Sequence, residues 1–340
     1  MTRPFVFEME TSDPDDLLTL ILLLGHPMVD LRAVVVSPGS REQVGVVRQV
    51  LAMFKRADVA VGSHRLDHPK GCVSAWHYGN GLGIRPQEAD ADPGVDVLAS
   101  VLGPDTTYVC GAPPKNLGEL LARGGDALLG RAFVQGGFAG EGVVPYEQQL
   151  PKFKGKVTVP SFNLNGAPKT VQAILDQRAR FSDLRFVSKN VCHGVVYDQV
   201  LHTMLGSLRQ TWCGHTAHSR CTCPCHAPGA RVMHVMPCCS RCPICGDEVT
   251  TPHKVPKDRT AFSQMLLYLA MGAYLSRHPQ GKALHDPLAA CCAIDPDVGE
   301  WAEVELFHDK GNWGSRLSEA SGVRIITGCD LSRFIDVLIP

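Results

Sequence analysis

The stretch from Glu8 to Asp16 constrains the fold most strongly, because it places five carboxylates within nine residues between two apolar runs. Residues 5–7 before it are typical of a buried strand, and residues 17–24 after it are typical of a buried helix. Acids at such a turn would lie at the carboxyl end of a parallel strand, where open α/β sheets bind ligands. Crowded carboxylates repel one another, so the loop predicts a divalent cation with oxygen ligands, calcium being the best candidate.

The same acids have a simpler interpretation as helix caps. Asp13, Asp15 and Asp16 surround Pro14 at the expected helix start, where acids bind free N–H groups and favour the helix dipole. A cap needs one such residue or two. Five acids exceed that need and favour the metal site.

Strand-like and helical segments alternate along the rest of the chain. Strands are expected at residues 31–36, 59–62, 107–110, 131–135 and 323–327, and helices at 42–54, 117–123, 168–176, 262–275 and 331–338. Residues 64–94 and 161–166 are expected as loops, and Asp286 is expected to cap a helix that begins at Pro287. The alternation predicts an α/β fold, a mostly parallel central sheet with helices on both faces.

Composition excludes several broad classes. The 340 residues are 44% hydrophobic and 20% charged, with a net charge of −1, as in ordinary soluble globular proteins. The net charge gives no argument for nucleic acid or an anionic membrane as partner. No run of eighteen apolar residues and no signal-peptide pattern appears, so a cytoplasmic location without membrane contact is expected.

Residues 206–255 differ from the rest and predict a small insertion between two parts, 1–205 and 256–340, of one α/β domain. Eight of the fourteen cysteines lie between Cys213 and Cys245, together with four histidines. Zinc takes four thiolate or imidazole ligands in a tetrahedron, and CxxC pairs bring two thiolates to one ion. The segment therefore predicts structural zinc, one or two ions, with candidate ligands Cys213, His215, His218, Cys221, Cys223, Cys225, His226, Cys238, Cys239, Cys242 and Cys245.

The alternatives for this segment are disulfides or free thiols, and the pairing of ligands into sites stays open. A catalytic zinc of the deaminase type would need a His-x-Glu motif, which the sequence lacks. The remaining cysteines are most simply small buried residues: Cys72, Cys110, Cys192, Cys291, Cys292 and Cys329.

Six short motifs, in order along the chain, resemble the inosine–uridine-type nucleoside hydrolase family. The counterparts are residues 8–16 for its acidic DxDxGxDD motif, 77–83 for His-Gly-x-(Asp/Asn)-Gly-Leu-Gly, 111–116 for Gly-Pro-x-Thr-Asn, 135–137 for Met-Gly-Gly, 161–163 for Glu-Phe-Asn and 285–287 for His-Asp-Pro. The resemblance implies a nucleoside-hydrolase-like fold and calcium-dependent hydrolysis of the N-glycosidic bond of a purine or pyrimidine nucleoside. It also implies a homo-oligomer.

Roles for individual residues follow from the resemblance. Glu10 would be the general base, and His285 would protonate or hydrogen-bond the leaving base. The implied calcium ligands are Glu10, Asp13, Asp15, Asp16, Asp286 and the carbonyl of Val134, and the implied substrate contacts are Asp15, His77, Asn80 and Asn163. The acidic motif is one residue longer than the family's, so which of Glu8, Glu10 and Asp13 is the base stays open.

These residues also have plain interpretations. His285 could bond only a neighbouring carbonyl, Asn163 could be a turn residue, and His77 could pack within its loop. His193 is expected to be structural.

Two departures from the family concern the substrate. Ser161 stands where the family has Glu, and Ser40 stands where it has Asn. Loss of an acid near the sugar's 5′ end would relieve repulsion toward a phosphate, so a phosphorylated or larger substrate is a hypothesis. The alternatives are thus an N-glycosidase acting on a nucleotide or on nucleic acid bound through the insertion, and a non-catalytic nucleoside- or sugar-binding protein.

Overall fold

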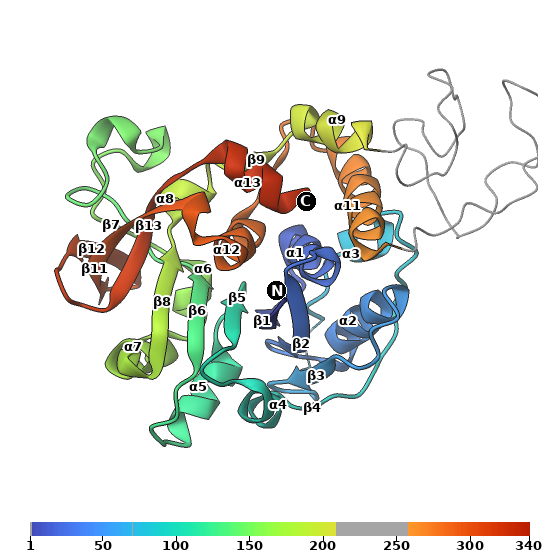
Figure 1. The fold of residues 1–340 in the computed structure, drawn as a ribbon, viewed down its shortest axis with the longest axis horizontal. Helices are drawn as coiled ribbons and strands as arrows, with labels where there is room; N and C mark the ends of the chain where they lie inside the picture. Colours follow the sequence, from blue (N-terminus) through green and yellow to red (C-terminus); the bar gives the residue numbers. More distant parts are fainter. Residues whose placement is uncertain (1, 70, 209–257) are drawn as a thin grey trace, which may run out of the picture.

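The structure, a computed structural model, describes residues 2–69, 71–208 and 258–340 (Figure 1). Its strands are β1 (Arg3–Met9), β2 (Val29–Val36), β3 (Ala60–Ser63), β4 (Asp92–Pro93), β5 (Thr107–Cys110), β6 (Gly130–Gln135), β7 (Thr158–Val159), β8 (Phe181–Val187), β9 (Val196–Tyr197), β10 (Lys282–Ala283), β11 (Gly299–Asp309), β12 (Asn312–Leu317) and β13 (Val323–Cys329). The α-helices are α1 (Pro14–Gly25), α2 (Arg41–Met53), α3 (Trp76–Gly79), α4 (Gly94–Val101), α5 (Lys115–Ala122), α6 (Phe162–Gly166), α7 (Pro168–Asp176), α8 (Lys189–Cys192), α9 (Gln199–Ser207), α11 (Arg259–Leu275), α12 (His285–Ile294) and α13 (Leu331–Leu338).

An eleven-stranded sheet organises the fold, in the strand order β4-β3-β2-β1-β5-β6-β8-β13-β11-β12-β7, and β9 and β10 pair in a separate two-stranded sheet. Neighbouring strands from β4 to β13 run parallel, and β11, β12 and β7 continue the sheet in antiparallel pairs. Strands from both ends of the chain thus share the sheet. The predicted mostly parallel sheet is confirmed, with β1 near its centre.

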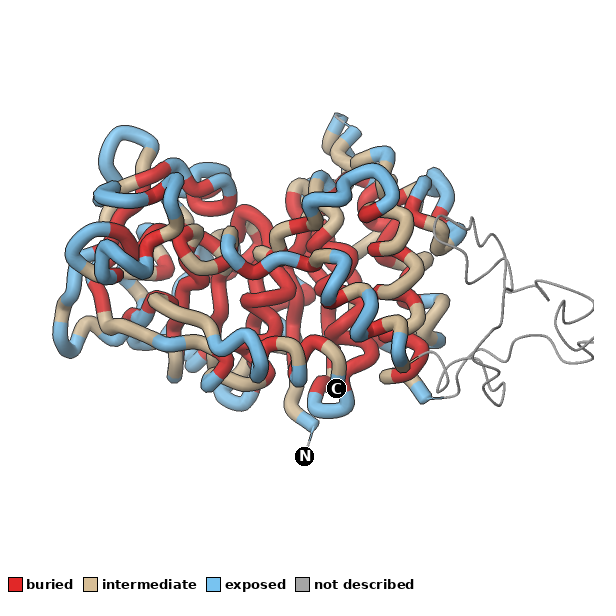
Figure 2. The backbone as a smooth tube through the Cα atoms, turned by 90° about the horizontal axis from the view of Figure 1, so that it is seen from above, coloured by how far each residue is buried: buried red, intermediate tan, exposed pale blue. Residues whose placement is uncertain are grey.

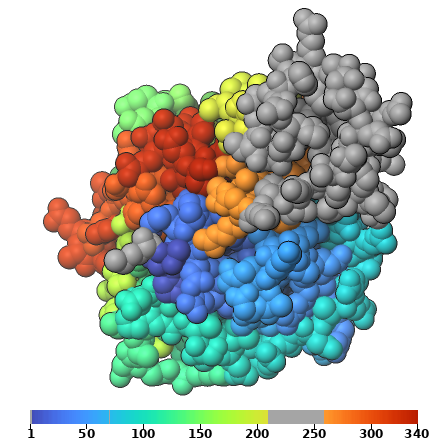
Figure 3. All heavy atoms as spheres, turned by 45° about the vertical axis from the view of Figure 1, so that its right-hand side comes forward, coloured from blue at the N-terminus to red at the C-terminus, as the bar shows by residue number. Residues whose placement is uncertain are grey.

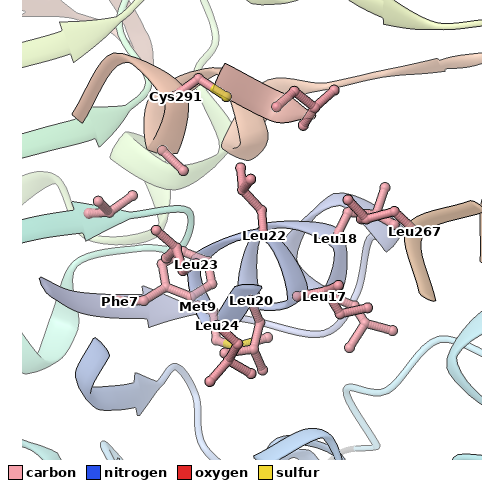
Figure 4. Packing of buried hydrophobic residues seen from close by; sticks show 14 of the residues in the cluster. Phe7, Met9, Leu17, Leu18, Leu20, Leu22, Leu23, Leu24, Leu267 and Cys291 are labelled. Atoms are coloured by element: carbon pink, nitrogen blue, oxygen red, sulfur yellow. The ribbon is translucent and has the colours of Figure 1, made fainter. Parts of the chain in front are cut away.

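Alternate residues of β1 face two different hydrophobic clusters. Phe5, Phe7 and Met9 pack in a cluster formed with α1, α11 and α12, whereas Val6 packs in a second cluster with α4, α5 and α7. In Figure 4 the leucines of α1 fill the space beside β1, and Leu22 points toward Cys291 of α12. Because a strand buried on both faces needs apolar residues at every position, the run before the acidic loop has no alternation. Helices therefore cover both faces, as predicted.

The first helix brings the two ends of the chain together. α1 packs against α12 and α11, so an element from the start of the chain lies beside two from its end. Figure 3 shows the N-terminal segment next to α11, and in Figure 2 the buried backbone runs through the middle of the molecule. This packing brings the predicted acidic loop close to the predicted His-Asp-Pro helix start.

Several local predictions were wrong. Residues 162–166 form the short helix α6 rather than a loop, and residues 64–94 contain α3 and β4. Helix α12 begins at His285, so Asp286 lies inside its first turn and does not cap it. Strands β8, β11 and β12 were not predicted.

The proposed zinc ligands, Cys213 to Cys245, lie outside the described residues, so zinc binding and the division at residues 205 and 256 stay predictions. Of the other cysteines, Cys110, Cys192, Cys291 and Cys292 are buried as predicted, whereas Cys72 and Cys329 are half-buried. None of the described helices is both long and apolar enough to cross a membrane.

Candidate active site

The acidic loop joins the carboxyl end of β1 to α1. Pro14 opens the helix, where its missing N–H costs nothing. Asp13 occupies the capping position but its side chain makes no capping hydrogen bond. Asp15 and Asp16 follow in the first turn and are only 2% and 1% exposed. Since none of these three acids serves as a surface cap, the capping interpretation does not account for them.

Asp15, Asp16 and Asp286 form a three-acid cluster. One carboxylate oxygen from each lies within 4.8 Å of the other two, and Asp286, in α12, is also buried. The backbone amides of His285 and Asp286 donate to Oδ2 of Asp15 at 3.0 and 3.4 Å. A carboxylate of α1 thus binds the free N–H groups at the start of α12, which explains why α12 begins without a cap of its own.

The cluster carries more negative charge than a buried site tolerates alone. Burial, with repulsion from neighbouring acids, raises the pKa of Asp16 and Asp286 well above its usual value. Burial is also the main cause that raises the pKa of Asp15 to about 7. Oxygen ligands held this close suit a hard divalent cation, and calcium accepts several carboxylates. The donor set therefore fits the metal predicted from the sequence.

A lysine that was not predicted also lies at this site. Lys282 of β10 is only 8% exposed, and its Nζ lies 2.8 Å from Oδ1 of Asp13 and 3.4 Å from Oδ1 of Asp15. Burial alone would raise the pKa of Asp13, but its hydrogen bond with Asp15 and the Lys282 ammonium outweigh burial and lower it. Asp13 therefore pairs with a side-chain cation and lies outside the three-acid cluster.

The two glutamates of the loop differ sharply. Glu8 is fully buried, and Ser37, Tyr108 and Asn116 donate side-chain hydrogen bonds to its carboxylate, along with the backbone amides of Asn116 and Leu117. Such a closed set of donors indicates a structural role. Glu10 is half-buried, lies outside the three-acid cluster, and accepts a hydrogen bond from Ser12 Oγ at 2.7 Å. Burial raises the pKa of Glu10 to about 7.

Burial lowers the pKa of both predicted histidines. Nδ1 of His285 is 3.2 Å from Sγ of Cys192, and burial together with Lys282 lowers the pKa of His285 to about 3. His77 is fully buried, with Nδ1 at 3.0 Å from Ser74 Oγ, and burial lowers its pKa to about 4. Within the described part of the chain, Nε2 of His77 and Nδ2 of the equally buried Asn80 have no hydrogen-bond partner.

The remaining predicted residues lie around the same edge of the sheet. Nδ2 of Asn163, in α6, donates to the carbonyl of Gly111 at 3.0 Å and to Oε1 of Gln135 at 2.7 Å. Val134 lies one residue before the end of β6 and pairs with Cys110 and Phe186 of the neighbouring strands. The carbonyl of Val134 as a metal ligand stays a prediction.

The two departures from the family motif have local roles. The Ser40 side chain accepts from the Gln43 amide and the Gln43 side chain binds the Ser40 amide, which together form a capping box at the start of α2. Ser161 is 2% exposed and its Oγ accepts a hydrogen bond from the Gly137 amide at 3.2 Å. Neither adds a charge to the site.

Comparison with known proteins identifies the family. The family model described as inosine-uridine preferring nucleoside hydrolase matches residues 9–336. The chain belongs to this family. Nucleoside hydrolases cleave N-glycosidic bonds of ribonucleosides, so the protein is an N-glycosyl hydrolase and the expected enzyme class is confirmed. No curated protein matches the sequence.

Solved structures of other nucleoside hydrolases share the fold. A purine-preferring ribonucleoside hydrolase from Gardnerella vaginalis is 15% identical with a TM-score of 0.60, covering 99% of this chain and 97% of its own. An inosine-uridine preferring enzyme from Bacillus anthracis is 13% identical with a TM-score of 0.59, covering 99% and 98%. An inosine-guanosine nucleoside hydrolase is 13% identical with a TM-score of 0.61, also covering 99% and 98%. At such low identity the similarity shows the fold alone.

Proposed function

We propose that this nucleoside hydrolase uses calcium, held by Asp15, Asp16 and Asp286, to cleave a ribonucleoside. The observation that carries the proposal is the three-acid cluster, because its buried carboxylates come from α1 and α12 and have oxygens within 4.8 Å of one another. Lys282 supplies one positive charge nearby, and it contacts only Asp15 of these three acids. A second cation is therefore needed for the cluster to be ionised at neutral pH.

The acids of the site would differ in whether they bind the metal. Calcium, when bound, would offset the charge of the acids, lower the pKa of a water molecule and hold sugar hydroxyls. Its ligands would be the three clustered acids and the carbonyl of Val134. Asp13 and Glu10, predicted as further ligands, lie outside the cluster, since Asp13 pairs with Lys282 and Glu10 with Ser12.

Glu10 is the best candidate for the general base. Its pKa of about 7 suits a group that takes a proton at neutral pH, and its backbone amide donates to Oδ1 of Asp16 at 2.9 Å, which fixes the loop beside the cluster. The water oxygen would bond to the anomeric carbon while the electrons of the C–N bond leave with the base. Glu8 is excluded as the base because its carboxylate is enclosed by protein donors.

Polar atoms around the cluster would bind the substrate. An unpaired buried polar atom costs about 1–3 kcal/mol, so Nε2 of His77 and Nδ2 of Asn80 are suited to a nucleoside's hydrogen-bonding groups. Asp15 and Asn163 would contact the ribose. Since Nδ1 of His285 faces Cys192, its Nε2 is the nitrogen available to hydrogen-bond the leaving base. The homo-oligomer and the contact of residues 206–255 with nucleic acid stay predictions.

The test separates metal binding from proton transfer. Calcium binding by calorimetry and base release from inosine and uridine are measured for the wild type, Asp286→Asn and Glu10→Gln, with exposed Asp309→Asn as control. We expect Asp286→Asn to lose both calcium binding and turnover. Glu10→Gln should keep calcium and lose about 10²–10⁴-fold in rate, as for loss of a general base. Calcium binding that Asp286→Asn leaves intact would overturn the proposal.

A further inference from the structure

A second group of potential metal ligands adjoins the acids but differs from them in chemistry. Cys192 ends α8, His193 follows it, and His285 begins α12. One ligand atom from each lies within 4.8 Å of the other two. Sγ of Cys192 is 3.2 Å from Nδ1 of His285, and the two imidazole rings are 4.5 Å apart between centroids. We call these three residues the Cys-His-His cluster.

We propose that the Cys-His-His cluster is a separate site for zinc or a similar transition metal. A thiolate and two imidazoles are soft ligands that suit zinc and not calcium. Two ligand atoms of a tetrahedral zinc lie about 3.5 Å apart, given Zn–S and Zn–N bonds of about 2.3 and 2.0 Å. Sγ of Cys192 and Nδ1 of His285 are 3.2 Å apart, which is close to that value before any ion is bound. Three protein ligands leave the fourth position to water.

The surroundings hold these ligands in place. Nε2 of Gln135 donates to Sγ of Cys192 at 3.5 Å, and the backbone of His285 is fixed by its amide hydrogen bond to Asp15. Cys192 is buried, whereas His193 and His285 are partly exposed, so an ion would approach from the histidine side. Supporting contacts of this kind orient metal ligands and raise affinity.

Two groups must change when an ion binds. The Cys192 thiol gives up its proton to solvent as the sulfur–metal bond forms. The Lys152 ammonium, which donates to Nδ1 of His193 at 2.9 Å, must rotate away if that nitrogen is the ligand, and its exposed position allows this. Neither change involves the three-acid cluster, so the inference stands whether or not calcium binds there.

Cobalt titration tests the site in the full-length chain. The protein is stripped of metal under reducing conditions and given excess calcium, which occupies carboxylate ligands and leaves soft ones free. Cobalt is then added, and the thiolate-to-cobalt absorption counts the ions bound through sulfur. The cysteines between residues 213 and 245 are predicted to bind zinc and would then take up cobalt as well, so the measurement compares variants with equal thiol counts. The pair is Cys192→Ser and Cys329→Ser, since Cys329 lies outside the cluster.

We expect Cys192→Ser to bind about one cobalt ion fewer than both the wild type and Cys329→Ser. His193→Gln, at a partly exposed position, should lose the same ion or bind it at least 10-fold more weakly. His193→Gln decides the question if Cys192→Ser does not fold. Equal cobalt stoichiometry and affinity in the wild type and His193→Gln would overturn the proposal.

Discussion

The ammonium group of Lys282 lies 2.8 Å from Oδ1 of Asp13, so a side-chain cation occupies the edge of a site otherwise built from acids. The same ammonium is 3.4 Å from Asp15, one of the three proposed calcium ligands. A fixed positive charge beside a metal site disfavours a second cation by repulsion. We therefore expect Lys282 to limit the affinity of the proposed calcium site.

Replacing this lysine is expected to tighten calcium binding. Lys282→Met keeps the length of the side chain and removes its charge, so the calcium dissociation constant should fall about tenfold, or roughly 1.4 kcal/mol. The metal-free variant should unfold at lower temperature, because Asp13 and Asp15 lose their counter-ion. Calorimetry with exposed Lys169→Met as control measures the change. An unaltered or weaker affinity would show that Lys282 does not oppose the metal.

Gly111→Ala tests whether calcium binding depends on the position of the Asp286 carboxylate. A Cβ at residue 111 would lie 2.7 Å from Cγ of Asp286, so Gly111→Ala must displace that carboxylate. We expect calcium binding at least tenfold weaker and a matching loss of base release. Gly103→Ala is the control, because a Cβ there meets no atom within 4 Å. Normal calcium affinity in Gly111→Ala would place the metal elsewhere.

Replacement of Glu8 and of Glu10 by Gln should affect different properties, stability for Glu8 and turnover for Glu10. Glu8→Gln replaces an acceptor with an amide that faces donors from Tyr108 and Asn116, so the free energy of unfolding should fall by about 1–3 kcal/mol. Its calcium affinity should change little, because Glu8 lies outside the three-acid cluster. Glu10→Gln should instead lose turnover with little change in stability. Chemical denaturation and activity assays on both variants distinguish the two roles, and equal losses of rate would contradict them.

The sequence predicted the elements whose side-chain pattern is local. Strand β5 and helices α7 and α13 have the bounds expected from apolar periodicity and flanking Pro or Asp residues. Strand β8 was missed because Asp183 and Arg185 interrupt its apolar run. In the structure these two form an ion pair at 2.8 Å, and the Arg185 guanidinium lies over the Trp301 ring, so the charges are accommodated.

The site was predictable only in part, because it joins residues that lie far apart in the sequence. The pairing of the acidic loop with Asp286 came from resemblance to a family, since nothing local links residues so far apart in sequence. Lys282 was missed because it is far from Asp13 and Asp15 in the sequence. Its ammonium group comes close to their carboxylates only in the folded chain. Nor did the pattern show that Asp15 would cap α12, which is why Asp286 was wrongly expected to cap it.

Ser161 leads to a prediction about the substrate. The residue is buried and uncharged where the family motif has Glu. The resemblance implies that this position faces the sugar's 5′ end, so we expect the site to lack an acid that would repel a 5′-phosphate. We expect kcat/KM for a nucleoside 5′-monophosphate to equal or exceed that for the nucleoside. Ser161→Asp should lower the ratio of the two values at least tenfold by restoring the repulsion, and Ser161→Ala should leave the ratio unchanged. A wild-type preference for the nucleoside would reject the hypothesis.

The pH dependence of stability tests the charge on the cluster. Burial and neighbouring acids raise the pKa of Asp286 above its unfolded value, so the folded metal-free protein binds more protons and loses stability as pH rises above about 4. Asp286→Asn removes this loss. Without metal, the variant should therefore gain stability relative to the wild type between pH 4 and pH 8, by at most about 1.4 kcal/mol per pH unit for one proton.

Comparing the two proteins is essential to this measurement, because His26, which is buried, and His193, which is half-buried, act in the opposite direction. Burial lowers the pKa of His26 and His193 to about 4, so each contributes stability that is lost as pH falls. Both histidines are present in the wild type and in Asp286→Asn, and their contribution cancels in the difference between the two denaturation curves. Calcium should then reverse the order at pH 8, because only the wild type binds it. A difference in stability that does not vary with pH would show that folding does not raise the pKa of Asp286.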